Sequence, residues 1–163
     1  MSIATSNTDI DNIKFRVLDI VRGTTVDGPG FRTAIYFAGC RHKCLGCHNP
    51  QSWDFDGGSE MTLSDIMQIV EEEDFDVTMT GGDPLYNAEK IATLAKSIVE
   101  SGHTVWLYTG FTIEQILESP ELSKPLPYLE AIVEGPFIES LRDTDLLFRG
   151  SSNQRIIKLN HGS

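Results

Sequence analysis

The apolar positions of the chain follow two periods, one typical of amphipathic helices and one typical of buried strands. Residues 62–73 carry apolar side chains at i, i+3, i+4 and i+7 after an N-capping threonine, and residues 88–101 repeat this pattern up to Gly102. A shorter helix is expected over residues 112–118, before Pro120. Short β-rich runs separate these helices, at residues 33–38, 76–80, 104–108, 130–134 and 155–159.

This alternation of strands and helices predicts an α/β fold with a parallel sheet, built either as an open doubly wound sheet or as an arc of a barrel. Residues 15–21 precede it as an edge strand or hairpin. In both architectures the chemistry gathers at the carboxyl ends of the strands. The first four strands of the alternating part each run into a loop with a glycine, at Gly39, Gly81, Gly110 and Gly135.

The domain prediction is simple, because 163 residues are enough for one domain and its core. Residues 1–14 are expected to form a flexible polar arm, and residues 15–163 a single domain. The net charge of −11 argues against nucleic acid or an anionic membrane as a partner. The sequence shows neither a membrane-spanning run nor a signal peptide, so we expect a soluble, cytoplasmic protein.

The three cysteines lie together, at Cys40, Cys44 and Cys47, directly after the first buried strand. Soft thiolates in such a cluster are typical ligands of zinc or of an iron–sulfur cluster. A closed zinc site would need a fourth ligand, with His42 and His48 as candidates. A 4Fe–4S cluster would leave one iron without a protein thiolate. The spacing favours iron–sulfur over zinc and leaves both possible.

The same residues carry a family resemblance. The C-x-x-x-C-x-x-C run at the end of a strand resembles the signature of the radical S-adenosylmethionine enzymes, and residues 80–84 (TGGDP) resemble their second motif. The resemblance implies a partial (β/α) barrel of about five mostly parallel strands. It also implies a 4Fe–4S cluster on the three cysteines, whose open iron is chelated by S-adenosylmethionine.

Further motifs are similar to those of the glycyl-radical activases, and among them of the subfamily that acts on anaerobic ribonucleotide reductase. They are residues 26–32 (VDGPGFR), 47–49 (CHN), 133–137 (VEGPF) and 148–154 (FRGSSNQ). The sequence departs from the wider pattern at Gly46, where many radical enzymes have an aromatic residue. It departs again at Glu134, where an aspartate is expected.

The resemblance assigns site residues by position. Gly81, Gly82 and Asp83 would seat the amino group of S-adenosylmethionine, and the backbone near Gly46 and His48 would line the same site. The ends of the third and fourth strands, at Thr109 and Glu134, would contact its ribose and carboxylate. Residues 149–153 either close this site or touch the partner. Apart from the resemblance, Arg41, His42 and Lys43 form a small basic patch beside the cysteines of an acidic protein, which would attract either an acidic electron donor or the partner protein.

The implied activity is oxidoreductive. A low-potential electron donor reduces the cluster, S-adenosylmethionine is cleaved to methionine and a 5′-deoxyadenosyl radical, and a glycyl radical forms on the reductase. Two alternatives stay open from the sequence. One is another small radical enzyme, such as an activator of pyruvate formate-lyase or a pterin-to-deazapurine synthase. The other is a non-enzymatic zinc or thiol module.

Overall fold

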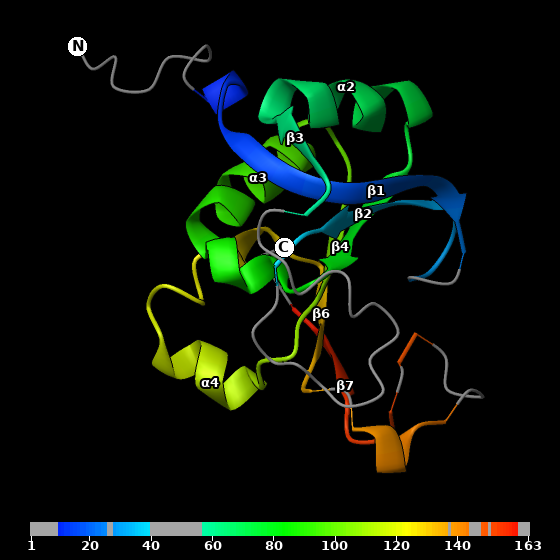
Figure 1. Cartoon of the computed structure of the whole chain (residues 1–163), viewed down its shortest axis with the longest axis vertical. Helices are drawn as coiled ribbons and strands as arrows, with labels where there is room; N and C mark the ends of the chain where they lie inside the picture. The colour runs from blue at the N-terminus through cyan, green and yellow to red at the C-terminus, as the bar shows by residue number, and fades with distance from the viewer. Residues whose placement is uncertain are drawn as a thin grey trace.

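A computed structural model shows a seven-stranded mixed sheet with helices against one face (Figure 1). The structure describes residues 10–25, 28–39, 57–136, 138–143, 148–149 and 151–159. The strands are β1 (Lys14–Thr24), β2 (Arg32–Phe37), β3 (Ser59–Thr62), β4 (Asp76–Gly81), β5 (Val105–Tyr108), β6 (Ala131–Glu134) and β7 (Arg155–Lys158). The helices are α2 (Leu63–Glu73), α3 (Ala88–Glu100) and α4 (Ile113–Glu118), with short 3-10 turns η2 (Pro84–Asn87), η3 (Leu126–Tyr128) and η4 (Glu139–Leu141).

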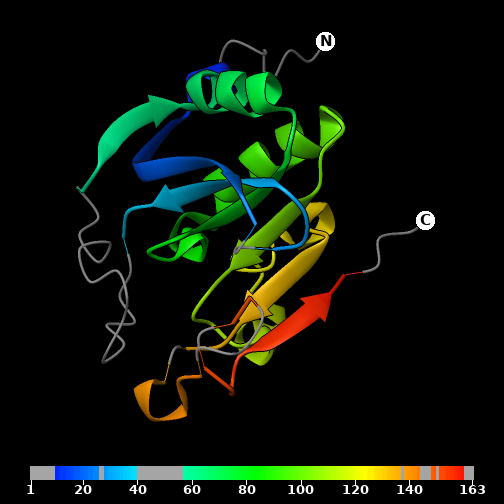
Figure 2. The ribbon, with the colours of Figure 1, turned by 90° about the vertical axis from the view of Figure 1, so that its right-hand side faces the viewer.

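The strand order is β3-β1-β2-β4-β5-β6-β7, and the four central strands β2, β4, β5 and β6 are parallel. The outer pairs are antiparallel, and Figure 2 shows β7 running opposite to β6. The two ends of the order, β3 and β7, do not pair with each other, so the sheet stays open. The predicted α/β fold and open partial barrel are confirmed.

Two details differ from the sequence prediction. The sheet has seven strands. Six of them correspond to the β runs read from the sequence, and the seventh is β3, a four-residue strand, SEMT, without a readable apolar alternation. The first strand is the predicted hairpin partner of β2 but not an edge, since β3 pairs with its other side. The division into an arm of residues 1–14 and a domain of 15–163 stays a prediction. Ile10 and Ile13 pack against the main core, and residues 1–9 lie outside the described part.

Helices α2 and α4 begin at capping side chains. Thr62 accepts a hydrogen bond from the backbone of Asp65, and Asp65 accepts one from the backbone of Thr62, at 3.1 and 3.0 Å. Thr112 and Gln115 form the same reciprocal pair ahead of α4. Such capping boxes satisfy backbone donors that the first helical turn leaves without partners.

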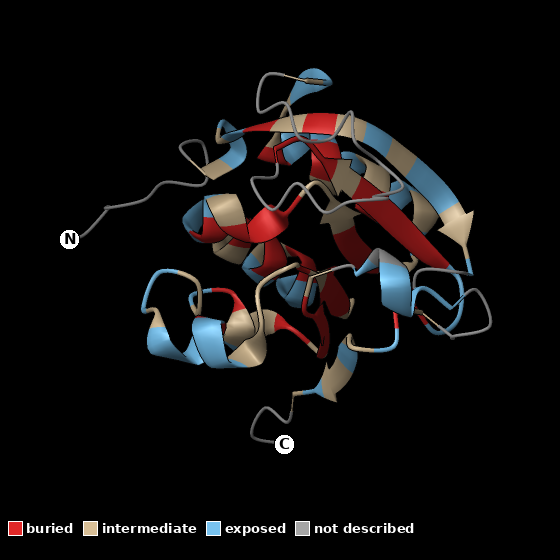
Figure 3. Cartoon of the chain, turned by 60° about the horizontal axis from the view of Figure 1, so that its bottom comes forward, coloured by how far each residue is buried: buried red, intermediate tan, exposed pale blue. Residues whose placement is uncertain are grey.

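Two apolar clusters pack on opposite faces of the sheet. The larger one joins α2, α3 and α4 to side chains such as Ile35, Met79 and Leu107, and Figure 3 shows the buried residues concentrated there. The smaller one lies on the other face and centres on Trp106, with Ala131 and Val133. None of the described α-helices contributes a residue to this second cluster. Within the described part of the chain, helices therefore cover the first face only.

Buried Arg32 crosses this second face. Its guanidinium donates to the Thr78 hydroxyl and the Val77 carbonyl, both at 2.9 Å, and lies 5.6 Å from the centre of the Trp106 ring. Burial lowers the pKa of Arg32 from its ordinary value, against the raising effect of the charges on Asp76 and Glu130. The arginine of the 26–32 motif thus anchors the start of β2 at the amino ends of the parallel strands.

No helix among the described residues is long and apolar enough to cross a membrane.

Helix α3 offers a test of the packing. Leu94 is fully buried, whereas Val99 on the same helix is 42% exposed. We expect Leu94→Ala to lower the free energy of unfolding by about 2–5 kcal/mol, because it removes apolar contacts and leaves a cavity. Val99→Ala should cost less than about 1 kcal/mol. Urea unfolding of both variants measures the difference, and equal losses would contradict this packing.

Candidate active site

The carboxyl ends of the parallel strands meet at one edge of the sheet. The loop Gly81 to Asp83 follows β4, Thr109 and Gly110 follow β5, and Glu134 ends β6. The structure therefore brings together the described members of the predicted site, as expected for a parallel sheet. Their proposed contacts with a cofactor stay predictions.

Gly81 is needed for close packing between β4 and β2. Its φ of +104° lies in the left-handed region, and a Cβ built there would overlap the backbone nitrogen and oxygen of Phe37. The next residue, Gly82, donates its backbone N–H to the Phe37 carbonyl at 2.7 Å. A side chain at Gly81 would push the loop away from β2. The packing of β4 against β2 therefore requires a glycine here, whether or not a ligand binds to the loop.

Asp83 ties the end of β4 to the end of β5. Asp83 is 1% exposed, and the single hydroxyl proton of Thr109 is shared between its two carboxylate oxygens, each 2.8 Å from the hydroxyl oxygen. The backbone N–H groups of Gly110 and Leu85 donate to it as well, at 2.8 and 3.0 Å. A buried carboxylate is tolerated when donors surround it in this way. Asp83 and Thr109 thus tie the loop after β4 to the loop after β5.

The Gly81–Asp83 loop also holds the point where the cysteine segment begins. The backbone N–H of Asp83 donates to the carbonyl of Gly39 at 2.7 Å, and Gly39 is the residue before Cys40. At the far end of this segment, Arg16 donates to the carbonyls of Gly57 and Gly58, at 3.2 and 2.7 Å. Both ends of the segment are therefore anchored at this side of the sheet.

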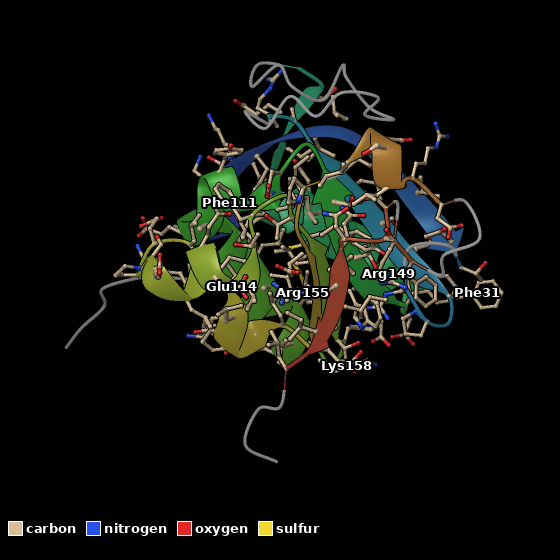
Figure 4. All side chains as sticks on the ribbon, turned by 90° about the horizontal axis from the view of Figure 1, so that it is seen from below. Phe31, Phe111, Glu114, Arg149, Arg155 and Lys158 are labelled. Carbon is tan, nitrogen blue, oxygen red and sulfur yellow. The ribbon has the colours of Figure 1, made fainter. Side chains whose placement is uncertain are left out.

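Glu134 forms a second buried carboxylate, on the other side of β5. It is 1% exposed and accepts the backbone N–H of Ile113 at 2.6 Å, which joins β6 to the start of α4. Arg155 of β7 donates to both oxygens of Glu134, at 2.6 and 3.1 Å. The same guanidinium donates to Glu114, at 2.8 and 3.1 Å, and Figure 4 shows Glu114 and Arg155 side by side.

The hydrogen bonds among these side chains shift the pKa values of Glu114 and Arg155. Hydrogen bonds from Arg155 hold the pKa of Glu114 below its ordinary value, and those to Glu134 and Glu114 raise the pKa of Arg155. Sequence reasoning missed both Arg155 and Glu114 as part of this edge. Glu114 lies 41 residues before Arg155, and no local pattern links two positions so far apart.

The segment around Ser151 braces the turn after β6. The Ser151 hydroxyl donates to Asn153 at 2.6 Å, and the Asn153 amide donates to the carbonyl of Pro136 at 2.8 Å. Arg149 and the side chain of Gln154 add hydrogen bonds to backbone carbonyls, at 3.0 Å each. These contacts give part of the 148–154 motif a role in holding the turn that follows Glu134.

The remaining predicted site residues lie outside the described part of the chain. They are the proposed cluster ligands Cys40, Cys44 and Cys47, the proposed cofactor-lining residues Gly46 and His48, and the basic residues Arg41, His42 and Lys43.

Comparison with known proteins identifies relatives over most of the chain. The model of the 4Fe-4S single cluster domain family matches residues 26–157. The anaerobic ribonucleoside-triphosphate reductase-activating protein of Enterobacteria phage T4 is 34% identical over 139 residues, which cover 80% of this chain and 86% of the relative. The proteins of the same name from Pasteurella multocida and Escherichia coli K12 are 31% and 30% identical. They are covered over 90% and 89% of their lengths, and this chain over 82% and 79%.

Among solved structures, QueE from Escherichia coli shares the fold, with a TM-score of 0.57 at 15% sequence identity. The alignment covers 67% of this chain and 58% of QueE, so the chain spans less than two thirds of that neighbour. Together with the motifs and the strand-end geometry, these matches show that the chain belongs to the 4Fe-4S single cluster domain family and to the family of anaerobic ribonucleoside-triphosphate reductase-activating proteins.

Proposed function

We propose that this chain activates an anaerobic ribonucleotide reductase by generating a glycyl radical on it. The relatives that cover most of the chain carry the name of such activating proteins, and the matching family model describes a single 4Fe–4S cluster. When bound, the cluster and S-adenosylmethionine supply the one-electron cleavage chemistry by which a hydrogen atom is removed from a glycine of the reductase. The protein's own residues bind, orient and shield these groups.

The observation that carries this proposal is the hydrogen bond between Asp83 and Gly39. It joins the predicted cofactor loop to the residue that precedes the first cysteine. The donor set also fits the group, because Cys40, Cys44 and Cys47 supply three soft thiolates and the chain contains no fourth cysteine. Three ligands would leave one iron for S-adenosylmethionine, which the neighbouring Gly81–Asp83 loop would bind.

The side chains around this loop act as supports. Asp83 and Thr109 hold the ends of β4 and β5 together, and Glu134 holds the start of α4 from the β6 side. Backbone groups of the Gly81–Asp83 loop are thereby presented at a fixed position, at the predicted seat of the amino group of S-adenosylmethionine. We propose that Thr109 and Glu134 fix the boundaries of the site that would take its ribose and carboxylate. Backbone near Gly46 and His48 would complete it.

The reductase itself is proposed to approach the face that carries Trp106. All the described α-helices pack on the opposite face, and none of them covers the Trp106 side of the open sheet, which supports this direction of approach. The basic residues Arg41 and Lys43 would then face the partner. A low-potential donor must supply the electron, and the proposal involves neither nucleic acid nor a membrane.

The proposal is tested by anaerobic reconstitution followed by mixing with the reductase and S-adenosylmethionine under reducing conditions. We expect 5′-deoxyadenosine to form, and a glycyl-radical doublet to appear in the electron paramagnetic resonance spectrum of the reductase. Cofactor cleavage without a radical on the reductase would support another radical enzyme instead. A colourless, zinc-containing protein as the only active form would support the zinc or thiol module.

The first prediction from this function concerns the three cysteines. Replacing Cys40, Cys44 or Cys47 by Ala should abolish both the iron content and the cleavage of S-adenosylmethionine, because each removes one of only three thiolate ligands. The wild-type chain should hold about four irons after reconstitution. Iron analysis and the 5′-deoxyadenosine assay measure the two effects. A variant that retains wild-type iron and activity would remove that cysteine from the ligand set.

The second prediction compares two aspartates near opposite ends of β4. Asp83 follows the carboxyl end of β4, and Asp76 at its other end accepts the backbone N–H of Thr104 at 2.9 Å. In Asp83→Asn, an amide NH2 group, which is a donor, replaces a carboxylate oxygen that faces other donors. The loop should therefore shift, and the affinity for S-adenosylmethionine should fall at least about tenfold. In Asp76→Asn the affinity should stay within about twofold, because the change lies at the opposite end of the sheet.

The spectral response of the reduced cluster to added S-adenosylmethionine measures both affinities. Iron content serves as the control for assembly, and it should be normal in the two variants. Wild-type affinity in Asp83→Asn would show that this carboxylate does not position the cofactor loop.

A further inference from the structure

A basic groove lies on the helix-covered side of the sheet, between β1, the end of β2 and the start of α3. Its volume is about 210 Å³. Phe15 and Phe37 form part of its lining, and the cationic side chains of Lys14, Arg16 and Lys90 line it as well. We refer to it as the Lys14–Lys90 groove.

The charge of this groove is opposite to that of the chain. The protein carries a net charge of −11 and only 13 lysines and arginines, yet three of them line one groove, and the described residues of that lining include no carboxylate. Lys90 donates to the backbone carbonyl of Lys14 at 3.0 Å, and no described carboxylate forms an ion pair with it. Lys14 approaches Glu60 at 3.7 Å, but both side chains are more than half exposed, so water and salt weaken this pair. The groove therefore attracts acidic groups.

The groove adjoins both ends of the segment that contains the cysteines. Phe37 is the last residue of β2, and the next residue, Ala38, donates its backbone N–H to the carbonyl of Arg16 at 3.0 Å. The Arg16 guanidinium holds the carbonyls of Gly57 and Gly58, after the far end of the segment. A protein bound in the groove would thus contact β2, from which the cysteine segment starts, and Arg16, which binds the backbone where this segment ends.

The groove also lies away from the face that the reductase is proposed to use. Phe15, Phe37 and Ile91 belong to the larger core on the helix side, whereas Trp106 belongs to the cluster on the other face. A partner in the groove would leave the Trp106 face accessible. The two surfaces can therefore serve two different partners.

We propose that the Lys14–Lys90 groove is the docking surface for an acidic protein that donates single electrons. This inference rests on the proposed function, which requires such a donor. On docking, the donor loses one electron and the cluster gains it, so that no atoms are transferred. The cationic rim selects the donor by its acidic surface and speeds the encounter, while the apolar lining seats a side chain of the donor.

The test uses oxidised flavodoxin, an acidic flavoprotein, as the probe for binding to the reconstituted holoprotein. In the charge-reversal variant Lys14→Glu/Lys90→Glu, the Kd at low ionic strength should rise by about tenfold. The matched control is Lys96→Glu/Lys124→Glu, which changes the net charge equally at exposed lysines outside the groove lining. Its Kd should stay within about twofold of wild type.

Equal weakening in the two double variants, or none in the groove variant, would overturn the proposal. The same holds if the groove variant loses affinity for the reductase and keeps its affinity for flavodoxin, because the groove would then belong to the other partner. Should the reversal variant fail to hold iron, Lys14→Gln/Lys90→Gln replaces it, with an expected rise in Kd of about threefold.

A second readout separates this inference from the proposed function. Reduced methyl viologen is a small cationic donor that needs no acidic docking, so its reduction of the cluster and the resulting 5′-deoxyadenosine should be unchanged in the groove variant. If wild type itself produces no 5′-deoxyadenosine with methyl viologen, the proposed function fails, whatever the flavodoxin affinities are. If it does and only flavodoxin binding is insensitive to the groove, the docking inference alone fails.

Discussion

The buried carboxylate of Asp83 is the interaction on which the arrangement of the strand-end loops depends. It accepts hydrogen bonds from the Thr109 hydroxyl and from the backbone N–H groups of Gly110 and Leu85, while its own backbone N–H reaches Gly39. One residue therefore joins the ends of β2, β4 and β5. Because a charged group buried to this extent must keep its donors, the three strand ends cannot move independently without leaving the carboxylate unsatisfied.

Glu134 extends the same principle to the next strand. Glu134 fixes the start of α4 by accepting the backbone N–H of Ile113, and it forms an ion pair with Arg155 of β7. The loop after β5 is thus held from both sides by buried carboxylates, Asp83 toward β4 and Glu134 toward β6. Asp83, Thr109 and Glu134, which the resemblance assigns to the cofactor site, form hydrogen bonds within the protein that keep neighbouring backbone groups in position.

Most of the fold could be predicted from the sequence, because helices such as α2 and α3 have clear apolar periods and capping residues at their ends. The parallel order followed from the alternation of helices with buried strands. The strand β3 was missed, because four residues in which polar and apolar side chains do not alternate carry no readable signal. That Gly81, Asp83, Thr109 and Glu134 gather at one edge was predictable, because parallel strands present their carboxyl ends there.

The side-chain partners at this edge were not predictable. Arg155 meets Glu114 across 41 residues and Thr109 meets Asp83 across 26, and such pairs arise only from the folded topology. The resemblance of the motifs named the family, and the relatives confirmed it. The assignment of individual residues to the cofactor stays a prediction, since the cysteine segment lies outside the described residues.

The central claim is that the Gly81–Asp83 loop and the cysteine segment form one site for S-adenosylmethionine. Electron–nuclear double resonance of the reduced cluster, with S-adenosylmethionine carrying ¹⁵N in its amino group, tests it most directly. The account predicts a resolved ¹⁵N coupling in wild type, and a weaker coupling in Asp83→Asn at a S-adenosylmethionine concentration that just saturates wild type. The absence of any coupling in wild type, with a reduced cluster and saturating S-adenosylmethionine, would contradict it.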